Sequence, residues 1–111
     1  MILIFAHHYD AEAAWLYGQF QKKYKIKVCL IIPEALGLDY NITLRLNNSG
    51  EHESIIYFFK EQIKINGGEV RYVINRLSYI NPLVWQNAEP DERTYATNEL
   101  NAFFPAFMYT L

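Results

Sequence analysis

Two short apolar runs near the amino terminus, separated by a segment with helical spacing, constrain the fold most strongly. The first run spans residues 2–6 and the second spans residues 28–32, and both contain β-branched residues. Continuous apolar runs of this length, bounded by polar residues, are typical of strands that are covered on both faces, as in parallel sheets. Between the runs, apolar side chains recur on one face of a helix: Ala13, Leu16, Tyr17, Phe20 and Tyr24. The chain therefore opens with a predicted strand–helix–strand unit, whose crossover should be right-handed.

The polar residues around this predicted helix agree with the preferences of helix ends. Asp10 can cap the first turn, and Glu12 lies where the helix dipole favours negative charge. We interpret the one cluster of basic residues as the solvated end of this helix and the turn after it: Lys22, Lys23, Lys25 and Lys27. The formal net charge is −2. The chain lacks the positive footprint that nucleic-acid binding requires, so we expect no nucleic-acid partner.

Residues 40–76 show alternating apolar residues and turn signals. Apolar residues alternate with polar ones, as in a half-buried strand, at Ile42, Leu44 and Leu46. Residues 47–50 and 66–68 are turn signals, and residues 70–74 form another short apolar run. We expect several strands joined by tight turns. A helix over residues 54–65 is the alternative, because helical spacing also connects Ile55, Ile56, Phe59 and Ile63.

A long helix is predicted near the carboxyl end. It follows a loop over residues 81–90 that holds three apolar residues, Leu83, Val84 and Trp85. Pro90 suits the first helical position, and the acidic residues 91 and 92 suit the first turn. An apolar stripe at helical spacing then runs through Ala96, Leu100, Phe103, Phe107 and Leu111, and it is widened by Phe104 and Met108. Since proline lacks an amide hydrogen, Pro105 predicts a kink near Asn101 or a break at Phe104.

The last ten residues are almost entirely apolar, and Thr110 is the one clearly polar residue among them. A single sheet cannot cover the whole circumference of such a helix, and soluble monomers rarely expose so large an apolar patch. We therefore expect residues 1–111 to be a single domain at the N-terminal end of a longer protein. The alternative is a homodimer formed through this helix.

The clearest candidate ligand contacts follow the first predicted strand. His7, His8 and Asp10 lie at its carboxyl end, where open α/β sheets bind ligands, and next to a helix N-terminus that can meet an anion. Adjacent histidines in an extended segment point to opposite sides, so we expect no metal site. Helix capping by Asp10, with the histidines exposed at the surface, is the simpler interpretation.

Three stretches in the carboxyl-terminal third resemble the end of the pre-ATP-grasp domain in ATP-grasp-like proteins, which include enzymes that modify ribosomally made peptides. They are residues 73–77, which end an apolar strand in a polar pair, residues 91–96 and residues 99–103. The opening strand–helix–strand unit and the hairpins also agree, so the resemblance covers nearly the whole chain. It implies a small Rossmann-like α/β fold, with Asn75 and Arg76 facing an interdomain cleft. A salt bridge from Arg76 to Asp91, Glu92 or Glu99 is the structural alternative.

The resemblance implies a substrate-cleft domain of an ATP-grasp-type ligase or peptide-modifying protein, without catalytic residues of its own. ATP and magnesium would bind in downstream domains beyond Leu111, and the substrate would be a peptide or a small carboxylate. Whether the full-length protein is an active ligase stays open. Two other functions also stay open: a stand-alone interaction module that dimerises through its last helix, and a small flavodoxin-like ligand-binding domain that uses His7, His8 and Asp10.

Cysteine content and hydropathy bear on the compartment. Cys29 is the single cysteine, so no internal disulfide can form, and its apolar neighbours predict a buried core residue. No apolar stretch approaches the length of a membrane span, and the first apolar run is too short for a signal peptide. We therefore expect no membrane partner and a cytoplasmic location.

Overall fold

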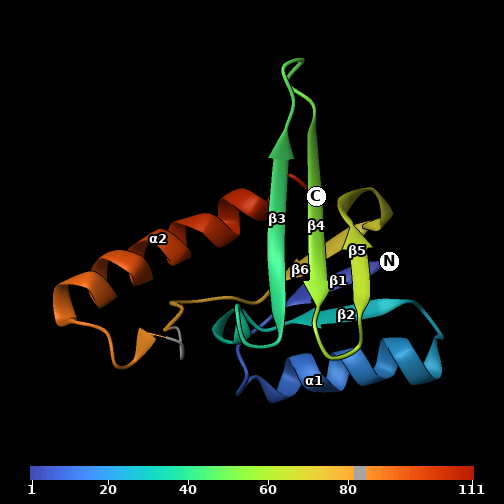
Figure 1. Cartoon of the computed structure of the whole chain (residues 1–111). Coiled ribbons are helices and arrows are strands. Elements are labelled where there is room, and N and C mark those ends of the chain that lie inside the picture. The colour runs from blue at the N-terminus through green and yellow to red at the C-terminus, as the bar shows by residue number, and fades with distance from the viewer. Residues whose placement is uncertain (82–84) are drawn as a thin grey trace.

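The computed structural model describes residues 1–81 and 85–111, and in that part of the chain two three-stranded sheets pack with a long C-terminal helix (Figure 1). The parallel sheet has the strand order β2-β1-β6, formed by β1 (Ile2–Phe5), β2 (Val28–Ile31) and β6 (Tyr72–Asn75). The antiparallel sheet has the order β3-β4-β5, formed by β3 (Tyr40–Leu46), β4 (His52–Phe58) and β5 (Ile63–Asn66). This confirms the α/β fold with an opening βαβ unit, a hairpin-rich middle and a C-terminal helix.

The opening unit has the predicted arrangement. β1 pairs in parallel with β2 from Ile2↔Val28 to Phe5↔Ile31, and its other edge pairs with β6. Helix α1 (Ala11–Gly18) continues into a short π-helical segment, η1 (Gln19–Lys23). Leu16, Tyr17 and Phe20 pack against this sheet as predicted, but Tyr24 is 58% exposed. The assignment of Tyr24 to the buried face is wrong, because a π-helix turns less per residue and moves later residues off that face.

The middle of the chain forms strands, so the alternative of a helix over residues 54–65 is wrong. Two short 3₁₀ turns, η2 (Pro33–Ala35) and η3 (Gly67–Glu69), connect the sheets. In the β3–β4 turn, Asn47 Oδ1 accepts hydrogen bonds from the amides of Ser49 and Glu51, and Gly50 has a positive φ of 83°. The hairpin extends beyond the body of the molecule (Figure 1), so Leu46 is 73% exposed at the far end of a strand that was expected to be half-buried throughout.

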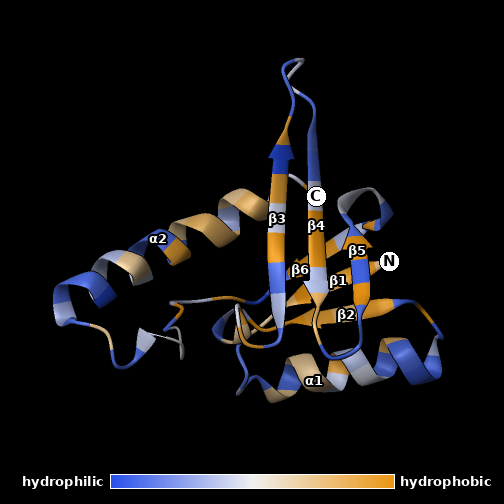
Figure 2. Cartoon of the chain, viewed as in Figure 1, coloured by the Kyte–Doolittle hydropathy of each residue, from blue (hydrophilic) through white to orange (hydrophobic). Residues whose placement is uncertain are grey.

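Helix α2 (Pro90–Met108) corrects the expectation of an uncovered apolar helix. Its apolar half is its C-terminal half (Figure 2), where Phe104 and Phe107 are 0% and 1% exposed. The two sheets supply six further buried members of this core cluster: Leu3, Phe5, Ile31, Tyr40, Ile56 and Ile65. The antiparallel sheet thus covers the side of the helix that the parallel sheet leaves open. Phe104 and Phe107 are therefore covered within the chain, whereas Phe103 and Met108 are only partly buried.

Pro105 lies within α2, which continues to Met108, so the predicted break at Phe104 is wrong. A proline this near the helix end removes one backbone hydrogen bond, and the amides of Tyr109 and Thr110 still bond to the carbonyls of Pro105 and Phe107. A kink near Asn101 stays a prediction. In the predicted loop before α2, Leu83 and Val84 lie outside the described residues, and Trp85 packs against the main core.

Candidate functional site

The carboxyl ends of the three parallel strands lie along one edge of their sheet, because Phe5 is in register with both Ile31 and Asn75. The polar residues that follow each strand are therefore brought together. His7 follows β1, Glu34 follows β2, and Arg76 and Ser78 follow β6. In open α/β sheets, ligands bind at this edge. We call this group, together with Asp10 and Glu12 at the start of α1, the strand-end cluster.

His7 joins all three strand ends. Its ring is 4% exposed, its Nδ1 atom lies 2.6 Å from Glu34 Oε1, and its Nε2 atom accepts a hydrogen bond from the backbone amide of Ser78 at 2.8 Å. The hydroxyl of Ser78 is 3.0 Å from the same nitrogen. Because an amide can only donate, Nε2 is the acceptor, and Nδ1 carries the proton that it donates to Glu34. The prediction that His7 is surface-exposed is therefore wrong.

Glu34 is 3% exposed, and its second carboxylate oxygen, Oε2, has no hydrogen-bond partner among the described residues. His8 lies at the rim of this pair, with Nδ1 3.7 Å from Glu34 Oε1, and its side chain is 57% exposed. The two histidines thus differ: His7 is buried, and His8, in the turn closed by a 3.1 Å hydrogen bond from the amide of Asp10 to the carbonyl of His7, faces solvent. Surface exposure is confirmed for His8.

Asp10 and Arg76 form an ion pair between the start of α1 and the end of β6. Asp10 caps α1 by accepting a hydrogen bond from the amide of Ala13, as predicted. The Nε atom of Arg76 donates a hydrogen bond to Asp10 Oδ2 at 2.7 Å. Its Nη2 atom donates to Asp10 Oδ1 at 3.2 Å and to Glu12 Oε2 at 3.1 Å. These hydrogen bonds hold the pKa of Asp10 below its usual range and raise the pKa of Arg76.

The partners of Arg76 differ from those expected. It pairs with Asp10 and Glu12, so the predicted salt bridge to Asp91, Glu92 or Glu99 is wrong. Strands β1 and β6 are adjacent and parallel, so the residues that follow them are neighbours. Arg76, after β6, therefore meets Asp10 and Glu12, which come after β1. Asp10 and Glu12 also place two protein carboxylates at the N-terminus of α1, where the sequence suggested an anion site.

Asn75 does not join the strand-end cluster. Its side-chain oxygen accepts the amide of Leu77 at 3.0 Å, which stabilises the turn after β6. It lines a separate surface hollow of about 270 Å³ with Val73, Pro105, Met108 and Tyr109. Asn75 and Arg76 therefore line different hollows of this chain.

A hollow of about 370 Å³ opens beside the strand-end cluster. Its walls are His7, Tyr9, Asp10, Ala11, Glu12, Arg76 and Ser78. The ring of Tyr9 stacks on His7, with 5.2 Å between the ring centroids. Two carboxylates and one guanidinium line the hollow, so its formal charge is negative when His7 is neutral. Such walls favour a cationic or hydrogen-bond-donating group over an anion.

Metal coordination gains no support from the arrangement. Within residues 1–81 and 85–111, no three histidine, cysteine, aspartate or glutamate side chains are grouped closely enough to hold a metal ion. In the same part of the chain, no helix is long and apolar enough to cross a membrane.

Sequence reasoning identified His7, His8, Asp10 and Arg76, and it missed Glu34 and Ser78. Both missed residues follow outer strands of the parallel sheet, β2 and β6, within three residues of the strand end. Their positions directly after two apolar runs are the signal that could have found them, because polar residues after parallel strands meet at one edge of the sheet.

Comparison with solved structures identifies proteins with the same fold. The chain resembles the RiPP-associated ATP-grasp ligase of Chryseobacterium gregarium, solved with ADP and a leader and core peptide, with a TM-score of 0.69 and 17% identity over 90% of this chain. It resembles the macrocyclase MdnB of Microcystis aeruginosa MRC with a TM-score of 0.74 and 14% identity over 99% of this chain. For the macrocyclase MdnC of the same organism, bound with precursor peptide MdnA, the TM-score is 0.69 and the identity 17% over 91% of this chain.

The chain spans 29%, 34% and 32% of these three structures, respectively, so it corresponds to about a third of each. The resemblance to ATP-grasp-like proteins that the sequence indicated is thus confirmed at the level of the fold. No protein-family model matches the sequence, and neither does any curated protein.

Proposed function

We propose that this chain is a substrate-cleft domain of an ATP-grasp-type, peptide-modifying protein and that it has no catalytic activity of its own. The observation that carries the proposal is the agreement in fold over 90–99% of the chain with an ATP-grasp ligase and two macrocyclases. Two of those structures contain a bound peptide. ATP and magnesium would bind in domains outside these 111 residues, and a cytoplasmic location would supply both.

The strand-end cluster supports a peptide, rather than a small carboxylate, as the substrate. The carboxylates of Asp10 and Glu12 outnumber the guanidinium of Arg76 at the walls of the hollow. A free carboxylate would meet net repulsion there, whereas a lysine side chain or an amino terminus would be attracted. Tyr9, which is 68% exposed and stacks on the buried His7, adds a flat ring surface that suits a neighbouring side chain of a peptide.

Calorimetric titration of the purified chain with ATP and magnesium tests the absence of catalytic machinery. We expect no heat of binding at millimolar nucleotide and no release of ADP over hours. Saturable binding of ATP, or its hydrolysis at a rate that depends on chain concentration, would overturn the assignment of nucleotide chemistry to other domains.

A homodimer through α2 is less well supported than the sequence suggested. Phe104 and Phe107, which were to form the interface, are buried inside the chain. Light scattering tests this alternative: a monomer at micromolar concentration agrees with the proposed function, and a stable dimer that Tyr109→Ala disrupts would restore the alternative.

A further inference from the structure

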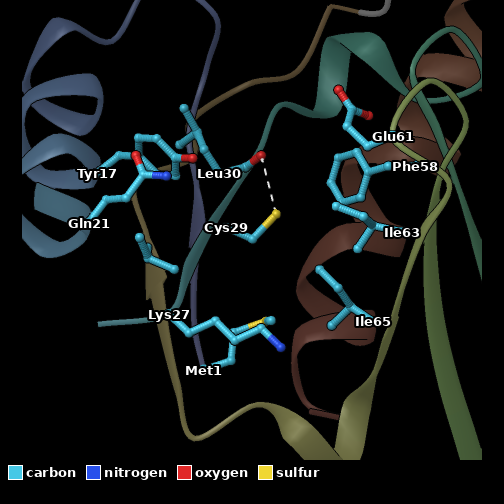
Figure 3. Close-up of a pocket in the computed structure, with 11 residues that line it drawn as sticks. Met1, Tyr17, Gln21, Lys27, Cys29, Leu30, Phe58, Glu61, Ile63 and Ile65 are labelled. Carbon is cyan, nitrogen blue, oxygen red and sulfur yellow. Dashed lines mark hydrogen bonds between the residues drawn. The ribbon is translucent and has the colours of Figure 1, made fainter. Parts of the chain in front are cut away.

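The outer strands of the two sheets face a common hollow. β2 ends the parallel sheet and β5 ends the antiparallel sheet, so each has one edge without a neighbouring strand in the described part of the chain. Between them lies a hollow of about 520 Å³, the largest described (Figure 3). It lies on the far side of β2 from β1, and it shares no residue with the hollow at the strand-end cluster.

In the described part of the chain, the edge of β2 that faces this hollow has no strand partner, and its Leu30 carbonyl accepts only a weak hydrogen bond from the Cys29 thiol, at 4.0 Å (Figure 3). The carbonyls of Lys27 and Ile31 accept hydrogen bonds from the amides of Ile2 and Ala6, at 3.0 and 3.1 Å, so both point toward β1. Backbone groups alternate along a strand, so those of Val28 and Leu30 point away from β1. An edge of this kind is a template for a further strand.

The walls of the hollow are mainly apolar. Cys29 from β2 faces Ile63 and Ile65 from β5, with Phe58 beside them (Figure 3). Ile63 is 51% exposed, and a bound peptide chain could bury most of this apolar surface. Burial raises the pKa of the Cys29 thiol to about 11, so at neutral pH it is an uncharged part of this wall. An apolar side chain would replace water here at a gain in free energy.

One charge of each sign stands at the two ends of the hollow. Lys27 directly precedes β2, and Glu61 lies toward the other end of that strand (Figure 3). Both side chains are exposed, and neither belongs to an ion pair found among the described residues. A ligand that satisfies both must carry a positive group near Glu61 and a negative group near Lys27.

We propose that this hollow binds an extended apolar peptide segment that pairs antiparallel with the free edge of β2. We choose the antiparallel direction because antiparallel pairs are slightly more stable per residue than parallel ones. In this direction a basic amino-terminal residue lies at Glu61 and an acidic carboxyl-terminal residue lies at Lys27, whereas a parallel peptide would need the opposite charge order. Three to four apolar residues would lie between them, since four extended residues span roughly 13 Å, the length of β2. The inference is independent of the proposed function, and this chain alone suffices to test it.

Two five-residue probes with blocked termini test the proposal: Lys-Val-Ile-Val-Glu and Glu-Val-Ile-Val-Lys. They have the same composition and opposite charge order. Titration followed by amide NMR should show shifts at Val28 and Leu30, slower hydrogen exchange at both amides, and a preference of about fivefold for the first probe, as expected for two exposed charge pairs. The bound probe should also slow the alkylation of Cys29 by iodoacetamide.

The variant Lys27→Glu/Glu61→Lys keeps the net charge and reverses the two ends, so it should prefer the second probe by a similar factor. Lys22→Glu/Glu51→Lys makes the same exchange at exposed positions away from the hollow and should keep the original preference. Binding without change at Val28 and Leu30 would overturn strand addition. Equal affinity of the two probes, or an unchanged preference in Lys27→Glu/Glu61→Lys, would overturn the assigned direction.

Discussion

The Nδ1 atom of His7 lies 2.6 Å from Oε1 of Glu34, and both side chains are almost completely buried at the carboxyl edge of the parallel sheet. This contact ties the residue after β1 to the turn after β2. Ser78 completes the connection to β6 through the other ring nitrogen. The hollow beside these strand ends therefore has one rigid wall, which a substrate-positioning role requires.

Removing the His7 ring should destabilise the fold strongly. His7→Ala leaves the Glu34 carboxylate buried without its partner, and we expect a loss of about 3 kcal/mol in the free energy of unfolding. His8→Ala is the matched control, because that side chain is 57% exposed and should change stability by less than about 0.5 kcal/mol. Urea denaturation of both variants provides the comparison. Equal losses for the two histidines would contradict the buried network.

The Asp10–Arg76 pair should contribute stability that depends on pH. Because Arg76 lowers the pKa of Asp10 in the folded chain, the contribution is complete above the pKa of an unfolded aspartate, near 3.9. It is lost as the pH falls through the lower folded value. A double-mutant cycle with Asp10→Asn, which retains a capping side chain, and Arg76→Gln should give a coupling at pH 7 that decreases as the pH falls below the pKa of an unfolded aspartate. A coupling that does not change with pH would argue against the ion pair.

The aromatic residues of α2 should behave as core residues of the isolated chain. Phe104 is fully buried and packs edge-to-face with Phe5 at 6.1 Å between centroids, so Phe104→Ala should cost about 3–5 kcal/mol. Tyr109 is 93% exposed, and Tyr109→Ala should be nearly neutral. Thermal denaturation at several protein concentrations measures both. A cost for Phe104→Ala that appears only at dimer-forming concentrations would restore the interface interpretation.

Cys29 should react slowly with alkylating reagents. Burial raises its pKa to about 11, so little thiolate exists at pH 8 in the folded chain, and the rate should increase about tenfold per pH unit until the pH approaches that value. The raised pKa also makes the free energy of unfolding depend on pH. The neutral thiol stabilises the folded chain at pH values below the pKa of an unfolded cysteine, and this stabilisation is lost as the pH rises toward 11. Mass spectrometry of iodoacetamide-treated protein gives the profile, with urea-unfolded chain as control. A plateau near pH 9 in the folded chain would contradict the burial.

Local patterns in the sequence predicted the elements well because each element carries its own signal. The apolar runs at β1 and β2, the cap at Asp10 and the proline at the start of α2 act within a few residues of one another. The exposed end of the β3–β4 hairpin was not predictable in this way. Leu46 has the alternation of a half-buried strand, but its burial depends on how far the hairpin extends past the other elements.

In the strand-end cluster too, local signals were visible in the sequence, whereas contacts between distant segments were not. His7, His8 and Asp10 were visible from sequence because they directly follow the first strand and precede a helix. Their partners depend on the strand order β2-β1-β6, which places Arg76 beside Asp10 and not beside α2. Covering of α2 likewise depends on the second sheet, whose position no local pattern specifies. Pairings between distant segments therefore required the structure.

We propose that this chain fills the role of the matching third of a peptide-modifying ATP-grasp enzyme. The most direct test of this role is a chimera of MdnC in which the segment that superposes on this chain is replaced by residues 1–111. MdnC lacking that segment is the control. The measurement is ATP consumption with and without the precursor peptide MdnA. We expect the chimera to consume ATP faster when MdnA is added, whereas the truncated enzyme does not respond. A chimera that is folded by circular dichroism, yet no more active than the truncated enzyme, would contradict the claim.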